Sequence, residues 1–118
     1  MGNTMLEEFM KLKLRLPKDN ESLLIQKLTD KAGKSVDLTN LKVLEMEDGH
    51  MGSLLLFTDG EYVKRKSTNF VSEIQFKDED GIMVLATLYS DINGIISELD
   101  IWKTNFEPLI KIPCSFNE

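Results

Sequence analysis

The sequence has a single cysteine and a single histidine in 118 residues, and each scarcity excludes a kind of site. Cys114 alone cannot form an intramolecular disulfide, so the fold is expected to form without cross-links. His50 alone cannot supply a pair of histidine ligands, and we expect neither a metal ion nor a cofactor. No apolar run approaches the ~20 residues of a membrane span, and residues 1–10 lack the apolar core of a signal peptide. These absences predict a cytoplasmic protein without a membrane segment.

Positive charge is also scarce. The chain has 14 lysines and arginines against 20 aspartates and glutamates, a formal net charge of −6. Nonspecific binding to nucleic acid needs a basic surface, so the balance argues against it and fits a basic protein partner better. The hydrophobic content of 42% and charged content of 29% are ordinary for a globular protein. At this length, residues 1–118 are expected to form one domain.

Residues 1–33 are predicted to be helical. Pro17 divides them, because the residue before a proline is pushed toward extended geometry. The stronger helix is expected to begin at Asp19 or Asn20, either of which can cap it, and to end at Gly33. Its apolar residues recur at helical spacing on one side. We therefore expect this helix to lie across one face of a sheet.

Residues 41–113 change to a period of two and predict a mainly antiparallel sheet of about five strands. The segment 53–58 is apolar on both faces, as a central strand would be. The segment 61–69 is polar and basic, and we expect either an edge strand or a loop with its Lys64-Arg65-Lys66 run in solvent. Asx-Gly pairs separate the runs as in hairpins: Asp48-Gly49, Asp59-Gly60, Asp80-Gly81 and Asn93-Gly94. Together with the helices, this pattern predicts an α+β fold.

The turns predict how the last three strands pair. A two-residue type I′ turn at Asn93-Gly94 places Leu88 opposite Leu99. A three-residue loop that ends in a left-handed Gly81 places Phe76 opposite Val84, whereas a two-residue loop would shift the register by one residue. The longer loop is preferred because it collects one apolar core face, made of Phe70, Ile74, Phe76, Val84, Ala86, Leu88, Leu99 and Ile101.

The same register gathers acidic and aromatic residues on the opposite face. One cross-strand row contains Glu73 and Asp100, with Trp102 on one side and Tyr89 beside Glu98 on the other. This face is either a half-solvated surface or a site for acid–base chemistry, a cation or a basic partner residue. Tryptophan and tyrosine are favoured at interfaces, so we take these five residues as candidate partner-binding residues.

Other motifs are weaker. The fragments 78–81 and 91–94 have the form of the start of a calcium loop, but both lack the remaining ligands. His50 lies between Asp48 and Ser53, yet the members of a catalytic triad normally converge from separate segments. We assign no catalytic residue.

Two segments resemble motifs of a known family. Residues 48–54, D-G-H-M-G-S-L, are similar to D-G-G-M-G-S-L, and residues 98–109, E-L-D-I-W-K-T-N-F-E-P-L, are similar to E-L-D-I-W-K-x-D-F-x-P-L. The family consists of small, mostly bacterial proteins described only as a domain of unknown function, and the likeness extends over about residues 14–113. It implies a small α+β domain and no catalytic residues. Besides the sheet residues, it marks Asp48, Gly49, Met51, Gly52, Ser53, Lys103, Phe106 and Pro108.

These observations favour a non-enzymatic protein-binding module with a basic partner. One form of such a module is an immunity-type protein that blocks a toxin, which is an analogy at the level of fold. The alternative is a small hydrolase or ligand-binding domain that uses the carboxylates of the sheet face. For Lys103, the alternation predicts a place on the core face at a strand end, from which its long stem could reach solvent.

Overall fold

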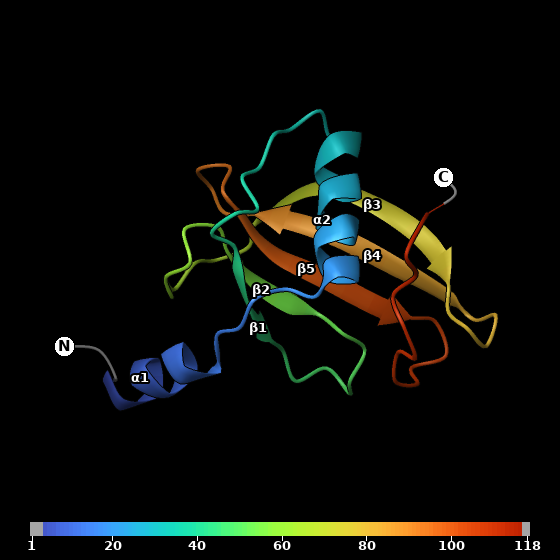
Figure 1. Cartoon of the computed structure of the whole chain (residues 1–118), viewed down its shortest axis with the longest axis horizontal. Helices are drawn as coiled ribbons and strands as arrows, with labels where there is room; N and C mark the ends of the chain where they lie inside the picture. Colours follow the sequence, from blue (N-terminus) through green and yellow to red (C-terminus); the bar gives the residue numbers. More distant parts are fainter. Residues whose placement is uncertain (1–3, 117–118) are drawn as a thin grey trace.

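The computed structural model describes residues 4–116, in which two helices accompany one five-stranded sheet (Figure 1). All strand pairs are antiparallel, and the strand order is β1-β2-β5-β4-β3. The predicted α+β fold is confirmed. The elements are α1 (Thr4–Lys13), α2 (Asp19–Lys31), β1 (Lys42–Glu45), β2 (Leu54–Phe57), β3 (Asn69–Lys77), β4 (Met83–Ser90) and β5 (Ile96–Lys103).

Helix α2 covers one face of the sheet, which we call the inner face (Figure 1). The backbone N–H of Lys18 donates to the Glu21 carboxylate at 2.7 Å, which satisfies a group that the first turn leaves open. The helix stops before Gly33, which has a φ of 67° that glycine adopts without a steric penalty. Leu24 and Leu28 are fully buried against β3 and β4. The predicted packing of this helix on the sheet is confirmed.

The segment after β5 runs beside α2 over the same inner face (Figure 1). Asn20 Nδ2 donates to the Ile112 carbonyl oxygen at 2.9 Å, and the Ile112 side chain belongs to the core. Phe116 packs edge-on against Phe76 with ring centroids 5.6 Å apart. Helix α2 and residues 104–116 therefore cover the inner face together, and within residues 4–116 no helix crosses β3, β4 and β5 on the opposite face.

The predicted register of the last three strands is confirmed at both hairpins. Phe76 lies opposite Val84, and Leu88 lies opposite Leu99. Phe70 is the exception, because the prediction of a core position for it is wrong. A bulge between Phe70 and Ser72 shifts the start of β3 by one residue, so Phe70 pairs with Tyr89 on the outer face and is 62% exposed.

The two-residue turn predicted at Asn93-Gly94 is also wrong. A type I′ turn needs positive φ at both turn residues, and here Gly94 has a φ of 85° while Asn93 does not have positive φ. The loop has three residues instead, closed by the Asp91 N–H that donates to the Ile95 carbonyl at 2.9 Å. The Asp91 carboxylate stabilises it by accepting the N–H groups of Asn93 and Ile95. A register shift after Tyr89 leaves Ser97 unpaired and restores the predicted pairing.

Residues 58–68 connect β2 to β3, which lie on opposite sides of β5 and β4 in the sheet. They contain no strand, so of the two expectations the loop is confirmed. Their basic run is only partly solvated. The Arg65 Nε atom lies 3.3 Å from Asp91 Oδ2, and the Arg65 side chain is 16% exposed. The arginine therefore attaches the connection to the β4–β5 turn.

Candidate functional site

The predicted acidic and aromatic residues do lie together on the sheet. We call their surface the outer face and define it by Phe70, Glu73, Thr87, Tyr89, Glu98, Asp100 and Trp102. Glu73 pairs with Thr87, which pairs with Asp100, and Thr87 Oγ1 donates to Glu73 Oε2 at 3.1 Å. Among residues 4–116, no lysine or arginine forms an ion pair with Glu73, Glu98 or Asp100. The three carboxylates thus lack an ion-pair partner among residues 4–116, while Lys31 Nζ donates to the backbone carbonyl of Glu73 at the edge of the sheet.

The electrostatics of this face act on its own residues. The pKa of Glu98 is raised, chiefly because burial disfavours the charged form and also because Asp100 lies nearby, although a hydrogen bond with Ser67 lowers it. The pKa of Tyr89 is raised by burial and by the neighbouring carboxylates. An incoming cation would offset the repulsion from the neighbouring carboxylates, which is the second cause of both raised pKa values.

Exposed aromatic rings border the acidic residues. Trp102 is 41% exposed and packs against Phe106, with ring centroids 5.7 Å apart and planes tilted by 59°. Phe106 is 70% exposed, and Phe70 provides a further exposed ring at the other end of the face. Such rings can contribute apolar contact and cation–π attraction to a partner. The sequence did not predict Phe70 on this face, because the residues around Phe70 contain no pattern that indicates a bulge.

The first motif segment forms the tight loop between β1 and β2. Both carboxylate oxygens of Asp48 accept backbone N–H groups, from Met51 at 3.1 Å and from Ser53 at 3.0 Å. Ser53 is buried, and its Oγ atom accepts the Ile101 N–H at 2.8 Å. Within the part of the chain that is described, no hydrogen bond joins the His50 side chain to Ser53 or Asp48. These side chains hold the loop and do not form a triad.

Lys103, in the second motif segment, lies on the core face as predicted, but its ammonium group does not reach solvent. The Nζ atom donates to Asp78 Oδ2 at 2.8 Å and to Asp80 Oδ2 at 2.6 Å, and the side chain is 1% exposed. Asp78 also accepts the backbone N–H groups of Ile110 and Lys111. This buried cluster attaches the chain that follows Pro108 to the β3–β4 turn.

The two motif segments meet beside each other. The Leu109 N–H donates to the His50 carbonyl at 3.0 Å. Gly52 has a φ of 100°, and a Cβ atom there would lie 3.1 Å from Leu109 Cδ2, so this position requires glycine. His50 has a φ of 61°, a left-handed conformation that is unusual for a residue with a side chain. The motif that the segment resembles has glycine at this position.

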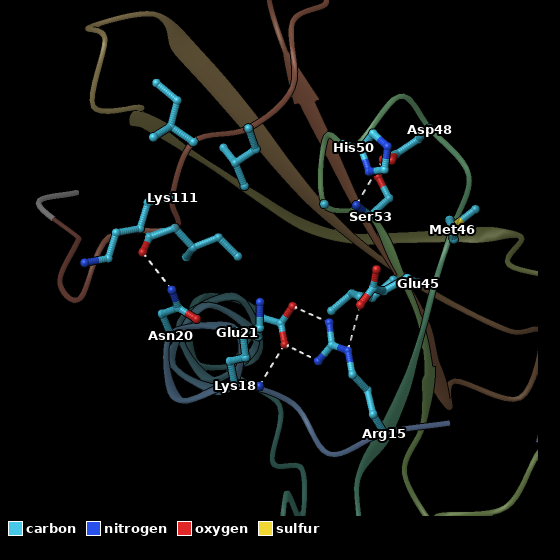
Figure 2. A pocket seen from close by; sticks show the side chains of 15 residues that line it. Arg15, Lys18, Asn20, Glu21, Glu45, Met46, Asp48, His50, Ser53 and Lys111 are labelled. Carbon is cyan, nitrogen blue, oxygen red and sulfur yellow. Dashed lines mark hydrogen bonds and ion pairs between the residues drawn. The ribbon is translucent and has the colours of Figure 1, made fainter. Parts of the chain in front are cut away.

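A cleft of about 250 Å³ opens where these loops approach the start of α2 (Figure 2). Arg15 lies in it between two carboxylates, with Nη1 2.8 Å from Glu21 Oε1 and Nε 2.9 Å from Glu45 Oε2. Burial alone would raise the pKa of Glu21, but hydrogen bonds from Arg15 and from the Lys18 N–H outweigh it and lower the pKa. The charges of the cleft already neutralise each other, so it offers no clear preference for a charged ligand.

Sequence reasoning missed the Arg15 cluster and the aspartates around Lys103. Arg15 pairs with partners 6 and 30 residues away, a relationship that no local pattern contains. For Lys103, the sequence did contain a usable signal that its ammonium group pairs with a carboxylate. Its alternation placed it inward, and a buried ammonium group requires an anionic partner. The nearest acidic turn was 78–81, which the predicted register had placed at the same end of the sheet.

No helix within residues 4–116 is long and apolar enough to cross a membrane. No group of three or more histidine, cysteine, aspartate or glutamate residues in that range has a geometry that could hold a metal ion.

The comparisons with known proteins point to a family. A family model described as a domain of unknown function (DUF6984) matches residues 14–113. No curated protein and no solved structure matches the chain.

Proposed function

The chain belongs to the DUF6984 family of domains of unknown function, and we propose that it is a non-enzymatic module that binds a basic protein through its outer face. One observation carries the proposal. Glu73, Glu98 and Asp100 share this face beside Trp102, and no described lysine or arginine pairs with them. A lysine or arginine of a partner would supply the missing charge.

The contacts of the motif residues support the outer face as the binding surface. Asp48 and Ser53 satisfy backbone groups of their own loop and of β5, and Lys103 is enclosed by two aspartates. Groups engaged in this way are not available to attack or bind a substrate. The outer face differs in one respect: its carboxylates accept hydroxyl groups, from Thr87 to Glu73 and from Ser53 to Asp100, but no described cation pairs with them.

An immunity-type role, in which the module blocks a basic toxin, is one specific form of this proposal. It requires a tight complex with electrostatic steering, which an acidic surface of this kind favours. The partner we expect presents lysine or arginine side chains around an apolar centre that can contact Trp102 and Phe106.

The experiment is affinity capture from the native cells, followed by binding measurements on the captured protein. We expect a basic partner whose affinity falls at least about tenfold with Asp100→Lys and with Trp102→Ala. Glu79→Lys is the matched control, because it reverses a charge at the exposed β3–β4 turn. Equal binding by the wild type and both outer-face variants would refute the proposal.

The raised pKa of Glu98 gives some support to a second function, because a general acid in a hydrolase needs such a carboxyl group. We place it second because Glu98 and Asp100 do not line the clefts beside α1, α2 or the C-terminal segment. Hydrolysis of a glycoside or ester by the wild type that disappears in Glu98→Gln would favour this alternative.

A further inference from the structure

The two edges of the sheet differ in how they are covered. Strand β1 is bridged on its free side by Arg15, whose N–H donates to the Val43 carbonyl at 3.0 Å and whose carbonyl accepts the Val43 N–H at 2.8 Å. Strand β3 forms the other edge, and in residues 4–116 no chain segment pairs with its outer side. An uncovered edge strand is a template for a further strand.

The register shows which backbone groups of β3 face outward. The Asp78 N–H donates to the Ile82 carbonyl just before β4, so these two residues form a hydrogen-bonded pair. Hydrogen-bonded pairs alternate with non-hydrogen-bonded pairs along an antiparallel ladder, so Phe76 and Ile74 also face β4 with their backbone groups. The N–H and C=O groups of Glu73, Gln75 and Lys77 therefore point away from the sheet. Lys31 Nζ confirms this direction, because it donates to the outward Glu73 carbonyl at 2.7 Å.

The side chains of the same three residues lie on the outer-face side of β3. Their charges are complementary when two copies of the strand run antiparallel. Glu73 and Lys77 carry opposite charges and stand two residues on either side of Gln75. If a second β3 lies antiparallel with Gln75 opposite Gln75, each glutamate faces a lysine of the other copy. Opposite charges directly across a strand pair are favourable, and like charges are unfavourable.

We propose that the free edge of β3 pairs antiparallel with β3 of a second copy of the chain, in a register centred on Gln75. The pairs Gln75 with Gln75 and Glu73 with Lys77 then each exchange two backbone hydrogen bonds. The Glu73 carbonyl can still accept from Lys31, because a carbonyl oxygen has two lone pairs. The two sheets become continuous, and the inference goes beyond the binding function proposed above.

The test is the molecular mass in solution, measured by sedimentation over a range of concentrations. We expect a reversible dimer whose dissociation constant rises at least about tenfold with Lys77→Glu, because each glutamate then faces another glutamate. The charge-swapped double variant, Glu73→Lys with Lys77→Glu, restores the dimer. A chain that stays monomeric at all concentrations would overturn the inference, as would a dimer that Lys77→Glu leaves unchanged.

The register has its own test in a Cys114→Ser background. Gln75→Cys places two thiols across the symmetry axis at a Cα separation of about 5.5 Å, which a short bifunctional thiol reagent can bridge. A short bismaleimide should yield a covalent dimer, and the exposed control Lys66→Cys should not be cross-linked. A dimer that Gln75→Cys fails to cross-link would contradict this register. Lys77 is on the outer-face side of β3 but is not one of the seven residues that define the partner-binding surface, so loss of the dimer in Lys77→Glu does not by itself count against partner binding.

Discussion

The Nζ atom of Lys103 lies 2.8 Å from Asp78 Oδ2, and both side chains are almost completely buried. The Asp78 carboxylate also accepts the Ile110 N–H at 2.8 Å and the Lys111 N–H at 3.1 Å. One buried pair therefore joins the end of β5, the β3–β4 turn and the C-terminal segment. Its main effect is to place the segment that carries Leu109 and Ile112 over the inner face.

Lys103→Met should destabilise the fold strongly, because it leaves the buried Asp78 carboxylate without its cation. We expect the melting temperature to fall by about 10 °C or more in a thermal unfolding experiment followed by circular dichroism. Lys111→Met, at an exposed lysine of the same segment, is the control and should change little. Equal melting temperatures for the two variants would show that the buried pair does not anchor this segment.

The same pair predicts loss of stability in acid. Burial tends to raise the pKa of Asp78, but hydrogen bonds from Ile110, Lys103, Glu79 and Lys111 lower it from 3.8 to about 2. A carboxyl group whose pKa is lower in the folded state stabilises the fold above its unfolded pKa, and this contribution is lost as the pH falls toward the folded value.

Urea unfolding at a series of pH values measures this contribution. The wild type should be more stable than Asp78→Asn at neutral pH, and the difference should shrink between about pH 4 and pH 2. A difference that stays constant over this range would mean that the Asp78 carboxylate is not stabilised in the folded state.

Glu98 predicts a pH dependence of stability opposite to that of Asp78. Its pKa is raised by burial and by Asp100, so ionisation of Glu98 costs stability as the pH rises through that pKa. Glu98→Gln should raise the melting temperature near neutral pH and leave it unchanged in acid, where the wild-type carboxyl is already neutral. Glu107→Gln, at an exposed site, controls for the change of side chain. A gain that persists in acid would point to a cause other than charge.

Two positions in the loop between β1 and β2, Gly52 and His50, predict opposite effects on stability, and Gly33 at the end of α2 serves as a comparison. Gly52→Ala should cost about 1–3 kcal/mol, since the added Cβ meets Leu109 at 3.1 Å in a left-handed backbone. Gly33→Ala should cost less, because open space surrounds that Cβ and only the backbone strain remains. His50→Gly should gain about 0.5–1 kcal/mol by relieving a φ of 61°. Denaturant unfolding gives all three values, and a destabilised His50→Gly would show that its side chain makes a needed contact.

Turn chemistry explains why so much of the sheet was predictable. The loop that ends in Gly81 has the predicted length, and it brings Phe76 opposite Val84. At the other hairpin the loop length was wrong, yet the predicted register held, because Ser97 is left unpaired and compensates for the longer loop. Alternation of apolar residues constrains the register even where a turn is misassigned.

The errors arose where one residue interrupts a strand or where partners are far apart in sequence. The bulge at Phe70 moves a ring from the expected core to the outer face, and no residue in that segment signals it. The pairing of Arg15 with Glu45 depends on the chain folding back onto β1. The acidic cluster was predictable because Glu98 and Asp100 alternate on one strand, and cross-strand pairing fixes Glu73 beside them.

The most direct test of the binding face is a nuclear magnetic resonance titration of the isotope-labelled chain with an oligo-arginine peptide. The proposal predicts saturable shifts at the amides of Tyr89, Glu98 and Asp100 and at the Trp102 indole N–H, weakened by salt and lost in Asp100→Lys. Shifts confined to other acidic segments, such as Glu7 and Glu8 in α1, would contradict the assignment of the outer face as the site for a basic partner.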